Sequence, residues 1–183
     1  KYRPNLWWNS YDGLKIGVNL NGGYLNHHHL FDFNFWINSG QLQNEDLTNK
    51  ENYDLYSYKL NYNTNLDNYM KYARIGLKSD FIAGLRTNKM SFSKYTLDKK
   101  SKIEIGLLSY YRTKGENYML YPEYWDINKF NNRIDLSLEH KYKINEISGE
   151  IELSTMSSAL FSDYNYNKFI LENINNASIF DLK

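Results

Sequence analysis

"NHHHLFDFNFWINSG", residues Asn26 to Gly40, contains the pattern that decides the fold. Phe31, Phe33, Phe35 and Ile37 occupy every second position, and the residues between them are mostly polar. A period of two places alternate side chains on opposite faces of an extended strand. The stretch therefore predicts a β-strand with one apolar face and one polar face.

The same alternation recurs along nearly the whole chain. It is found in segments 14–20, 56–62, 69–77, 89–97, 103–107, 134–142, 147–153 and 168–174, and it begins again at 179–183. No segment has an apolar stripe at helical spacing. We therefore expect an all-β fold, an antiparallel up-and-down transmembrane β-barrel with about nine to ten strands in this chain.

The composition is typical of a chain whose strands each have one face in contact with water and one face away from it. The 183 residues include 18 Tyr, 9 Phe and 4 Trp, yet the mean hydropathy is −0.71. A net charge of +1 gives no reason to expect nucleic acid as a partner, and the absence of cysteine excludes disulfides and thiolate metal sites.

The lengths of the predicted connections alternate. Short links are expected at 26–27, 64–67, 98–100, 144–145 and 175–177, and longer ones at 40–52, 82–88, 113–132 and 158–165. Outer-membrane barrels have short periplasmic turns and longer outer loops. The alternation therefore favours a barrel in a bacterial outer membrane.

Alternating strands also occur in soluble β proteins, where the apolar face points inward. Three features favour the membrane barrel: predicted strands of about ten residues, strongly charged polar faces, and aromatic residues near the strand ends. The aromatic residues are Trp7, Trp8, Tyr11, Tyr24, Tyr53, Tyr69, Tyr110, Tyr111 and Tyr142. Outer-membrane lipid is the expected partner, together with other outer-membrane proteins. A soluble β-barrel that binds a lipid or glycan is the alternative.

The barrel interpretation assigns each face. The predicted lipid-facing residues are Leu14, Ile16, Val18, Phe31, Phe33, Phe35, Ile37, Tyr58, Leu60, Ile75, Leu77, Ile103, Ile105, Leu107, Ile134, Leu136, Leu138, Ile151 and Leu153. The predicted lumen-facing residues are Asp32, Asn34, Arg74, Glu104, Asp135, Glu139, Lys141, Glu150 and Glu152, and the charged ones, with Lys102, are expected to pair across strands.

The sequence contains no catalytic motif. It lacks HExxH, GxSxG, a P-loop and a dinucleotide fingerprint. His27 and His29 can share one face of an extended segment, but no third ligand accompanies them, so we predict an interfacial turn rather than a metal site. No catalytic residue, metal or cofactor is expected in this segment.

The longest predicted connection contains "YMLYPEYWD", Tyr118 to Asp126. Its aromatic residues are Tyr118, Tyr121, Tyr124 and Trp125, which form a candidate surface for binding a glycan or a protein. The alternative is a loop that folds over the barrel mouth and packs on itself.

The first forty residues also carry a family resemblance. The matching residues are Arg3, Pro4, Leu6, Trp7, Trp8, Asn9, Asp12, Gly13, Leu14 and Gly17, then Phe31, Asp32, Trp36, Asn38 and Gly40. This pattern resembles the start of the barrel-like C-terminal region of Bacteroidota membrane proteins whose N-terminal part is similar to a gluzincin zinc aminopeptidase. The later "LYPEYWD" (Leu120 to Asp126) and "FNN" (Phe130 to Asn132) are similar as well.

The resemblance implies a single barrel region, residues 1–183, within a longer chain. It would serve as a membrane anchor or as a structural component of an outer-membrane complex. Alternatively, it would be the membrane part of an active zinc aminopeptidase with its catalytic domain upstream, and zinc would be needed only then. The expected direction of the first predicted strand, 14–20, also requires another strand before Lys1, and we expect these residues alone not to close a barrel.

Overall fold

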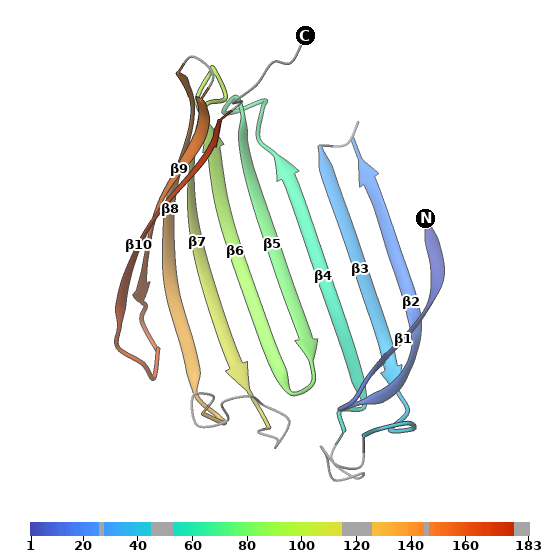
Figure 1. Ribbon diagram of the computed structural model, residues 1–183. Helices are drawn as coiled ribbons and strands as arrows, with labels where there is room; N and C mark the ends of the chain where they lie inside the picture. The colour runs from blue at the N-terminus through green and yellow to red at the C-terminus, as the bar shows by residue number, and fades with distance from the viewer. Residues whose placement is uncertain (26–27, 45–52, 115–125, 145–146, 178–183) are drawn as a thin grey trace.

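The computed structural model describes residues 1–25, 28–44, 53–114, 126–144 and 147–177, which form one ten-stranded antiparallel sheet (Figure 1). Each strand pairs with the next one in the sequence. The strands are β1 (Tyr2–Asn9), β2 (Gly13–Tyr24), β3 (His29–Asn38), β4 (Tyr56–Asn65), β5 (Ala73–Ile82), β6 (Leu85–Tyr95), β7 (Ser101–Arg112), β8 (Phe130–Ile144), β9 (Ile147–Ser158) and β10 (Asn167–Ala177).

The predicted all-β, up-and-down arrangement is confirmed, and every strand except β1 is at least 10 residues long. Within the described part of the chain, no helix is long and apolar enough to cross a membrane.

Strand β1 was not predicted as a strand. It pairs with β2 along its whole length, from Tyr2 opposite Leu20 to Asn9 opposite Gly13. Pro4 lies within this strand, opposite Val18, and proline is tolerated there because β1 is an edge strand. A strand therefore precedes segment 14–20 within residues 1–183, and it is β1.

The connections lie alternately at two ends of the sheet. The loop end carries connections 10–12, 39–55, 83–84, 113–129 and 159–166, and the turn end carries 25–28, 66–72, 96–100 and 145–146. Both of the longest connections are at the loop end, as expected. The predicted longer link at 82–88 is wrong, because Ala83 and Gly84 alone join β5 to β6, both with positive φ (50° and 73°). Such two-residue turns match the twist of the flanking strands.

The strand register separates the two predicted sets of residues onto opposite faces. Directly paired residues share a face, and successive residues alternate between faces. Ile16 pairs with Ile37, which pairs with Tyr56, while Asp32 pairs with Asn61 on the other side. Following the pairs from β1 to β10 places all predicted lipid-facing residues on one face and all predicted lumen-facing residues on the other.

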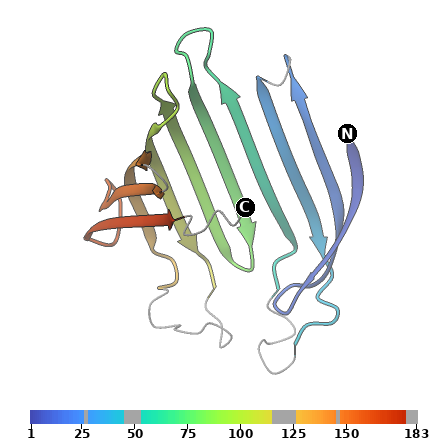
Figure 2. The same ribbon diagram turned by 45° about the horizontal axis from the view of Figure 1, so that its top comes forward.

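The polar face is the inside of the curve. Lys59 on β4 places its Nζ 5.2 Å from the centre of the Trp7 ring on β1. Two strands separate β1 from β4, about 14 Å on a flat sheet, so these side chains meet because the sheet bends toward them. Figure 2 shows this open trough with β1 and β10 at its two rims. We call the two sides the concave polar face and the convex apolar face.

Burial follows the same division. On the concave face Lys15 and Ser57 are 0% exposed, whereas on the convex face Ile16 and Ile37 are 61% and 64% exposed. Most exposed large apolar side chains of the strands project from the convex face. The sheet is therefore apolar outside and polar inside, the reverse of a water-soluble sandwich.

Three of the aromatic residues at strand ends do not belong to an outward girdle. Trp7 packs against Trp36 on the concave face, with ring centres 5.4 Å apart. Tyr11 is buried in the β1–β2 connection, and Tyr110 lies on the concave face. Trp8, Tyr24 and Tyr111 do lie on the convex face.

The sheet is not closed. β1 and β10 are its edges, and no pairing joins them within the described residues. The expectation that these residues alone leave the barrel open agrees with this arrangement.

The β5–β6 turn provides a test of the fold. We expect Gly84→Val to destabilise the protein by about 2 kcal/mol, because a β-branched residue is strained at positive φ. Ala83→Gly is the matched control and should be neutral or slightly stabilising, since glycine adopts positive φ without strain. Urea unfolding followed by circular dichroism measures both, and equal effects of the two substitutions would contradict this turn geometry.

Candidate functional site

The loop end of the sheet is organised by a buried polar cluster, which begins in the β1–β2 connection. The Asn9 side chain accepts a hydrogen bond from the backbone N–H of Asp12 (2.6 Å) and donates one to its carboxylate (3.2 Å). Asparagine favours such turns because its side chain bonds to the backbone a few residues ahead. The chain then enters β2 through Gly13 at a φ of 73°.

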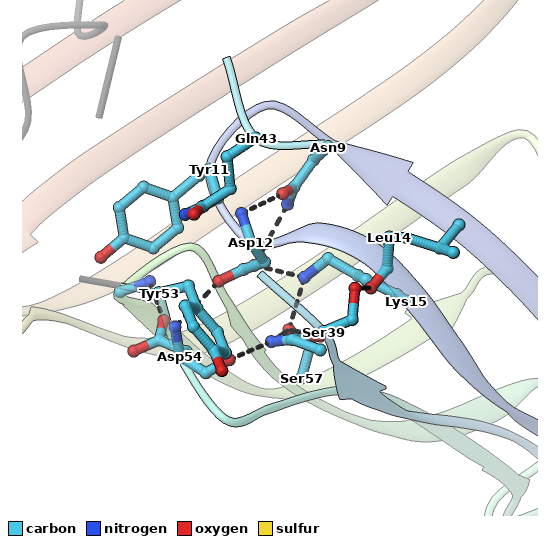
Figure 3. Close-up of polar contacts among 12 residues, drawn as sticks. Asn9, Tyr11, Asp12, Leu14, Lys15, Ser39, Gln43, Tyr53, Asp54 and Ser57 are labelled. Carbon is cyan, nitrogen blue, oxygen red and sulfur yellow. Dashed lines mark hydrogen bonds and ion pairs between the residues drawn. The ribbon is translucent and has the colours of Figure 1, made fainter. Parts of the chain in front are cut away.

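A fully buried ion pair lies at the centre of this cluster (Figure 3). The Lys15 ammonium contacts the Asp12 carboxylate, and both side chains are 0% exposed. Lys15 also donates to the Ser57 hydroxyl on β4 (2.7 Å), to which the Asn38 amide on β3 donates as well (3.0 Å). Burying two charges is costly, so such a pair persists only when further hydrogen bonds complete it.

The same cluster fastens connection 39–55. Gly40 donates its backbone N–H to the carbonyl of Asp12 (3.1 Å), and Asp54 donates its own to the Asp12 carboxylate (3.1 Å). A Cβ at Gly13 would lie 2.1 Å from the carbonyl oxygen of Gln41, so this approach requires glycine. The "NSYDGLK" stretch, Asn9 to Lys15, thus acts as a clamp on the first long connection.

Asp54 extends the cluster to two further connections. Its carboxylate accepts a hydrogen bond from the backbone N–H of Gly84 (2.6 Å) and forms an ion pair with Lys114 (3.2 Å). Four of the five connections at the loop end therefore share one polar network. Asp12 and Lys15 have no exposed surface, so this pair acts by holding the connections of the rim in place.

Charged residues line the middle of the concave face. Lys89 on β6, Glu104 and Lys102 on β7, and Glu139 on β8 form a continuous row with N–O distances of 2.9, 3.1 and 2.9 Å. Lys141 and Glu150 lie 3.8 Å apart between β8 and β9. Pairing across strands is therefore found for Glu104, Lys102, Glu139, Lys141 and Glu150, whereas Asp135 pairs with Arg133 on its own strand.

Near β1, asparagine side chains instead of charged ones form the contacts on the concave face. The Asn5 amide on β1 donates to the Asn34 side chain on β3 (2.9 Å), across the intervening strand β2, where Gly17 lies opposite Asn5. Asn19, also on β2, donates to Asp32 (2.5 Å) and to Asn34 (2.8 Å). The concave face thus satisfies much of its polarity through contacts between its own side chains.

A cavity of about 580 Å³ opens at the loop end beside β7 and β8. It is lined by Leu85, Tyr110, Tyr111, Arg112, Asp126, Lys129, Asn131, Arg133, Tyr164 and Tyr166. We call it the tyrosine pocket. The aromatic loop residues Tyr118, Tyr121, Tyr124 and Trp125, predicted as a binding surface, lie outside the described residues.

The charges at the edge of the tyrosine pocket stabilise one another. The Lys129 ammonium, 2.9 Å from the Asp126 carboxylate, lowers the pKa of Asp126 and has its own pKa raised in return. Partial burial, with the nearby Asp126 charge, raises the pKa of Tyr164. Asp126 therefore stays ionised, and Lys129 and Tyr164 stay protonated, throughout the neutral pH range.

The histidines do not gather into a site. His29 lies at the turn-end start of β3, where its Nδ1 is 2.6 Å from the Tyr62 hydroxyl, and His27 is outside the described residues. Within the described ranges, no group of three His, Cys, Asp or Glu residues is placed to hold a metal ion.

The tyrosine pocket was not predicted from the sequence. The only local signal is "SDYNYN", Ser162 to Asn167, where two tyrosines alternate with polar residues inside a connection. Nothing in the sequence placed them beside Tyr110 or Arg133, which come from strands far earlier in the chain. The buried Asp12–Lys15 pair had a signal in the Asn9–Asp12–Gly13 motif, but no spacing rule predicts its burial.

No protein-family model, curated protein or solved structure matches this chain. The resemblance to the barrel region of gluzincin-like membrane proteins therefore stays a prediction, as does the peptidase parent.

The buried ion pair yields a second test. We expect Lys15→Met to destabilise the protein by about 3–5 kcal/mol, because it leaves the Asp12 carboxylate buried without its counter-ion. Lys141→Met, which breaks the pair with Glu150, is the matched control. Those side chains are 64% and 40% exposed, so the cost should stay below about 1 kcal/mol.

Adding Asp12→Asn to Lys15→Met should recover part of the lost stability in urea unfolding, since no buried charge is then left unpaired. Strictly additive losses in this double-mutant cycle would contradict the coupling.

Proposed function

We propose that this chain forms wall strands of a transmembrane β-barrel in a bacterial outer membrane, serving as a membrane anchor or a structural component of a membrane complex. The observation that carries the proposal is the exposed convex apolar face, which extends over all ten strands. Exposed apolar patches of this extent mark surfaces that are covered in the working state. A lipid bilayer covers such a face around the whole outside of a barrel.

The dimensions of the face suit a bilayer. Along β2 the convex residues run from Leu14 to Tyr24, ten residue steps or about 33 Å of strand. A strand tilt of about 40° projects this length onto about 25 Å, the height of the apolar band in outer-membrane barrels. Aromatic residues border it, with Trp8 and Tyr111 near the loop end and Tyr24 near the turn end.

The soluble alternative requires a second layer over the apolar face. In a soluble sandwich another sheet packs about 10 Å from the first. All ten strands belong to one sheet here, and within the described residues no second layer covers the convex side. The curvature instead encloses the charged residues, as the lumen of a barrel does.

The proposal includes partners for both edges. In a bilayer the backbone groups of an unpaired strand cost several kcal/mol each, so β1 and β10 require additional strands or a seam between them. Such strands come from other parts of the same protein or from a partner. No catalytic residue or cofactor is assigned to this segment.

Two neighbouring residues on β8 test which face meets lipid. Leu136 lies on the convex face and Ser137 on the concave face. We expect Leu136→Arg to cost about 2–4 kcal/mol when the protein is refolded into phosphatidylcholine vesicles, whereas Ser137→Arg, the matched control, should cost less than about 1 kcal/mol. Equal small effects would contradict a lipid-facing convex surface.

Purification supplies a fourth prediction. The protein should require detergent to remain in solution, and its gel migration should change on heating, because folded barrels resist unfolding in cold detergent. A fully folded, monodisperse protein in buffer without detergent would refute the membrane proposal.

A further inference from the structure

The tyrosine pocket has the properties of a binding site, and the barrel proposal does not account for it. Its volume of about 580 Å³ is within the range of about 300–1,000 Å³ that is typical of small-molecule sites. Tyr110 and Arg133 enter it from the concave face of β7 and β8, and Tyr164 and Tyr166 enter from connection 159–166. It thus lies at the rim, where the concave face meets the loop end.

The connection that supplies two of the tyrosines is fastened to β8. Ala159 donates its backbone N–H to the carbonyl of Asn132 (2.8 Å), and Asp163 donates to that of Phe130 (2.8 Å). The Asp163 carboxylate in turn accepts the backbone N–H of Phe130 (2.6 Å). A wall held in this way loses little conformational freedom when a ligand binds.

The rings are held individually as well. Tyr166 donates its hydroxyl to the Asn131 side chain (2.8 Å), and Tyr164 donates to the Asp126 carboxylate (3.2 Å). The Arg133 guanidinium lies 5.3 Å from the centre of the Tyr110 ring. The hydroxyl contacts hold Tyr164 and Tyr166 at their edges, and Arg133 lies over one face of Tyr110. Rings held in this way supply a rigid, amphipathic surface for a ligand.

The charges narrow the chemical class of the ligand. Three cations among the described residues line the pocket. Arg133 is paired with Asp135 at 3.0 Å and Lys129 with Asp126 at 2.9 Å, and Arg112 donates to the backbone carbonyl of Lys114 (3.5 Å). An anionic ligand that bound Arg133 or Lys129 would have to displace these carboxylates. A purely apolar ligand would remove water from the partly exposed polar groups of the lining and give them no hydrogen bonds in exchange. A neutral molecule with many hydroxyl groups displaces no carboxylate, and it gives the polar groups of the lining hydrogen-bond partners.

We propose that the tyrosine pocket binds a short neutral oligosaccharide. Sugar rings present C–H faces that stack on the tyrosines, and their hydroxyl groups exchange hydrogen bonds with the Asp126, Asn131 and Arg133 side chains at the rim. The lining comes mainly from the concave face and from connections 113–129 and 159–166, and Tyr111 of the convex face also contributes to it. The groups assigned to sugar binding lie on the concave face and in these two connections, so the proposal does not require lipid on the convex face.

The test uses the whole chain, purified in detergent or in buffer, and a panel of fluorescent di- to tetrasaccharides of glucose, galactose, mannose and N-acetylglucosamine. At least one panel member should bind saturably. Tyr164→Ala and Tyr110→Ala should each weaken that binding about tenfold or more, the loss of one stacked contact. Tyr164→Phe keeps the ring and should weaken it no more than about threefold.

Tyr56→Ala is the matched control, because this aromatic side chain lies on the convex face. It should leave the affinity unchanged. Circular dichroism verifies the strand content of each variant, and Tyr164→Phe remains informative if an alanine variant does not fold.

Absence of binding across the panel would overturn the proposal. So would binding that both alanine variants retain, or a stronger response to sulfated or uronic oligosaccharides than to the neutral ones.

Discussion

The direction in which the sheet bends controls the rest of this structure. Side chains converge on the inside of a curved sheet, so polar groups placed there must find partners among themselves. The chain meets this requirement with the Lys89–Glu104–Lys102–Glu139 row, with the asparagines near β1, and with the buried Asp12–Lys15 pair. The outside of the curve is left with the aliphatic and aromatic residues, which extend over all ten strands. The proposed lipid contact follows from this arrangement, in which polar residues lie inside the curve and apolar residues lie outside it.

The loop end of the described structure is held together by polar contacts at two places. The buried cluster around Asp12 holds four of the loop-end connections together on one side of the rim. On the other side, connection 159–166 is hydrogen-bonded to β8. Lys114, which pairs with Asp54, follows β7 directly, and β7 also carries Tyr110 and Arg112 into the tyrosine pocket. Rigid walls with adaptable polar groups between them are the usual arrangement of a binding site on a scaffold of strands.

Prediction from the sequence succeeded where a local rule was sufficient. Alternation assigned Phe35 and Asp32 to opposite faces correctly, because the period of a strand is fixed by its backbone. It failed where nearness to a strand end was used in place of parity. Tyr110 lies three residues after Leu107, so the alternation places it on the concave face, where Arg133 lies over its ring. Trp7 lies in β1, for which no strand was predicted, and it packs against Trp36 on the concave face. The Ala83–Gly84 turn was missed because polar residues continue into the start of β6, which obscured where the strand begins.

The sequence by itself determined the strands other than β1, their two-sided character and the up-and-down order, because each depends on neighbours within a few residues or on the nearest strand. Only the tertiary structure decided which face is concave, and with it the buried cluster and the tyrosine pocket. The bond from Lys15 to Ser57 joins residues 42 positions apart, and the one from Tyr166 to Asn131 joins residues 35 apart. Such partners meet only through the accumulated register and curvature of several strands, which no local pattern encodes.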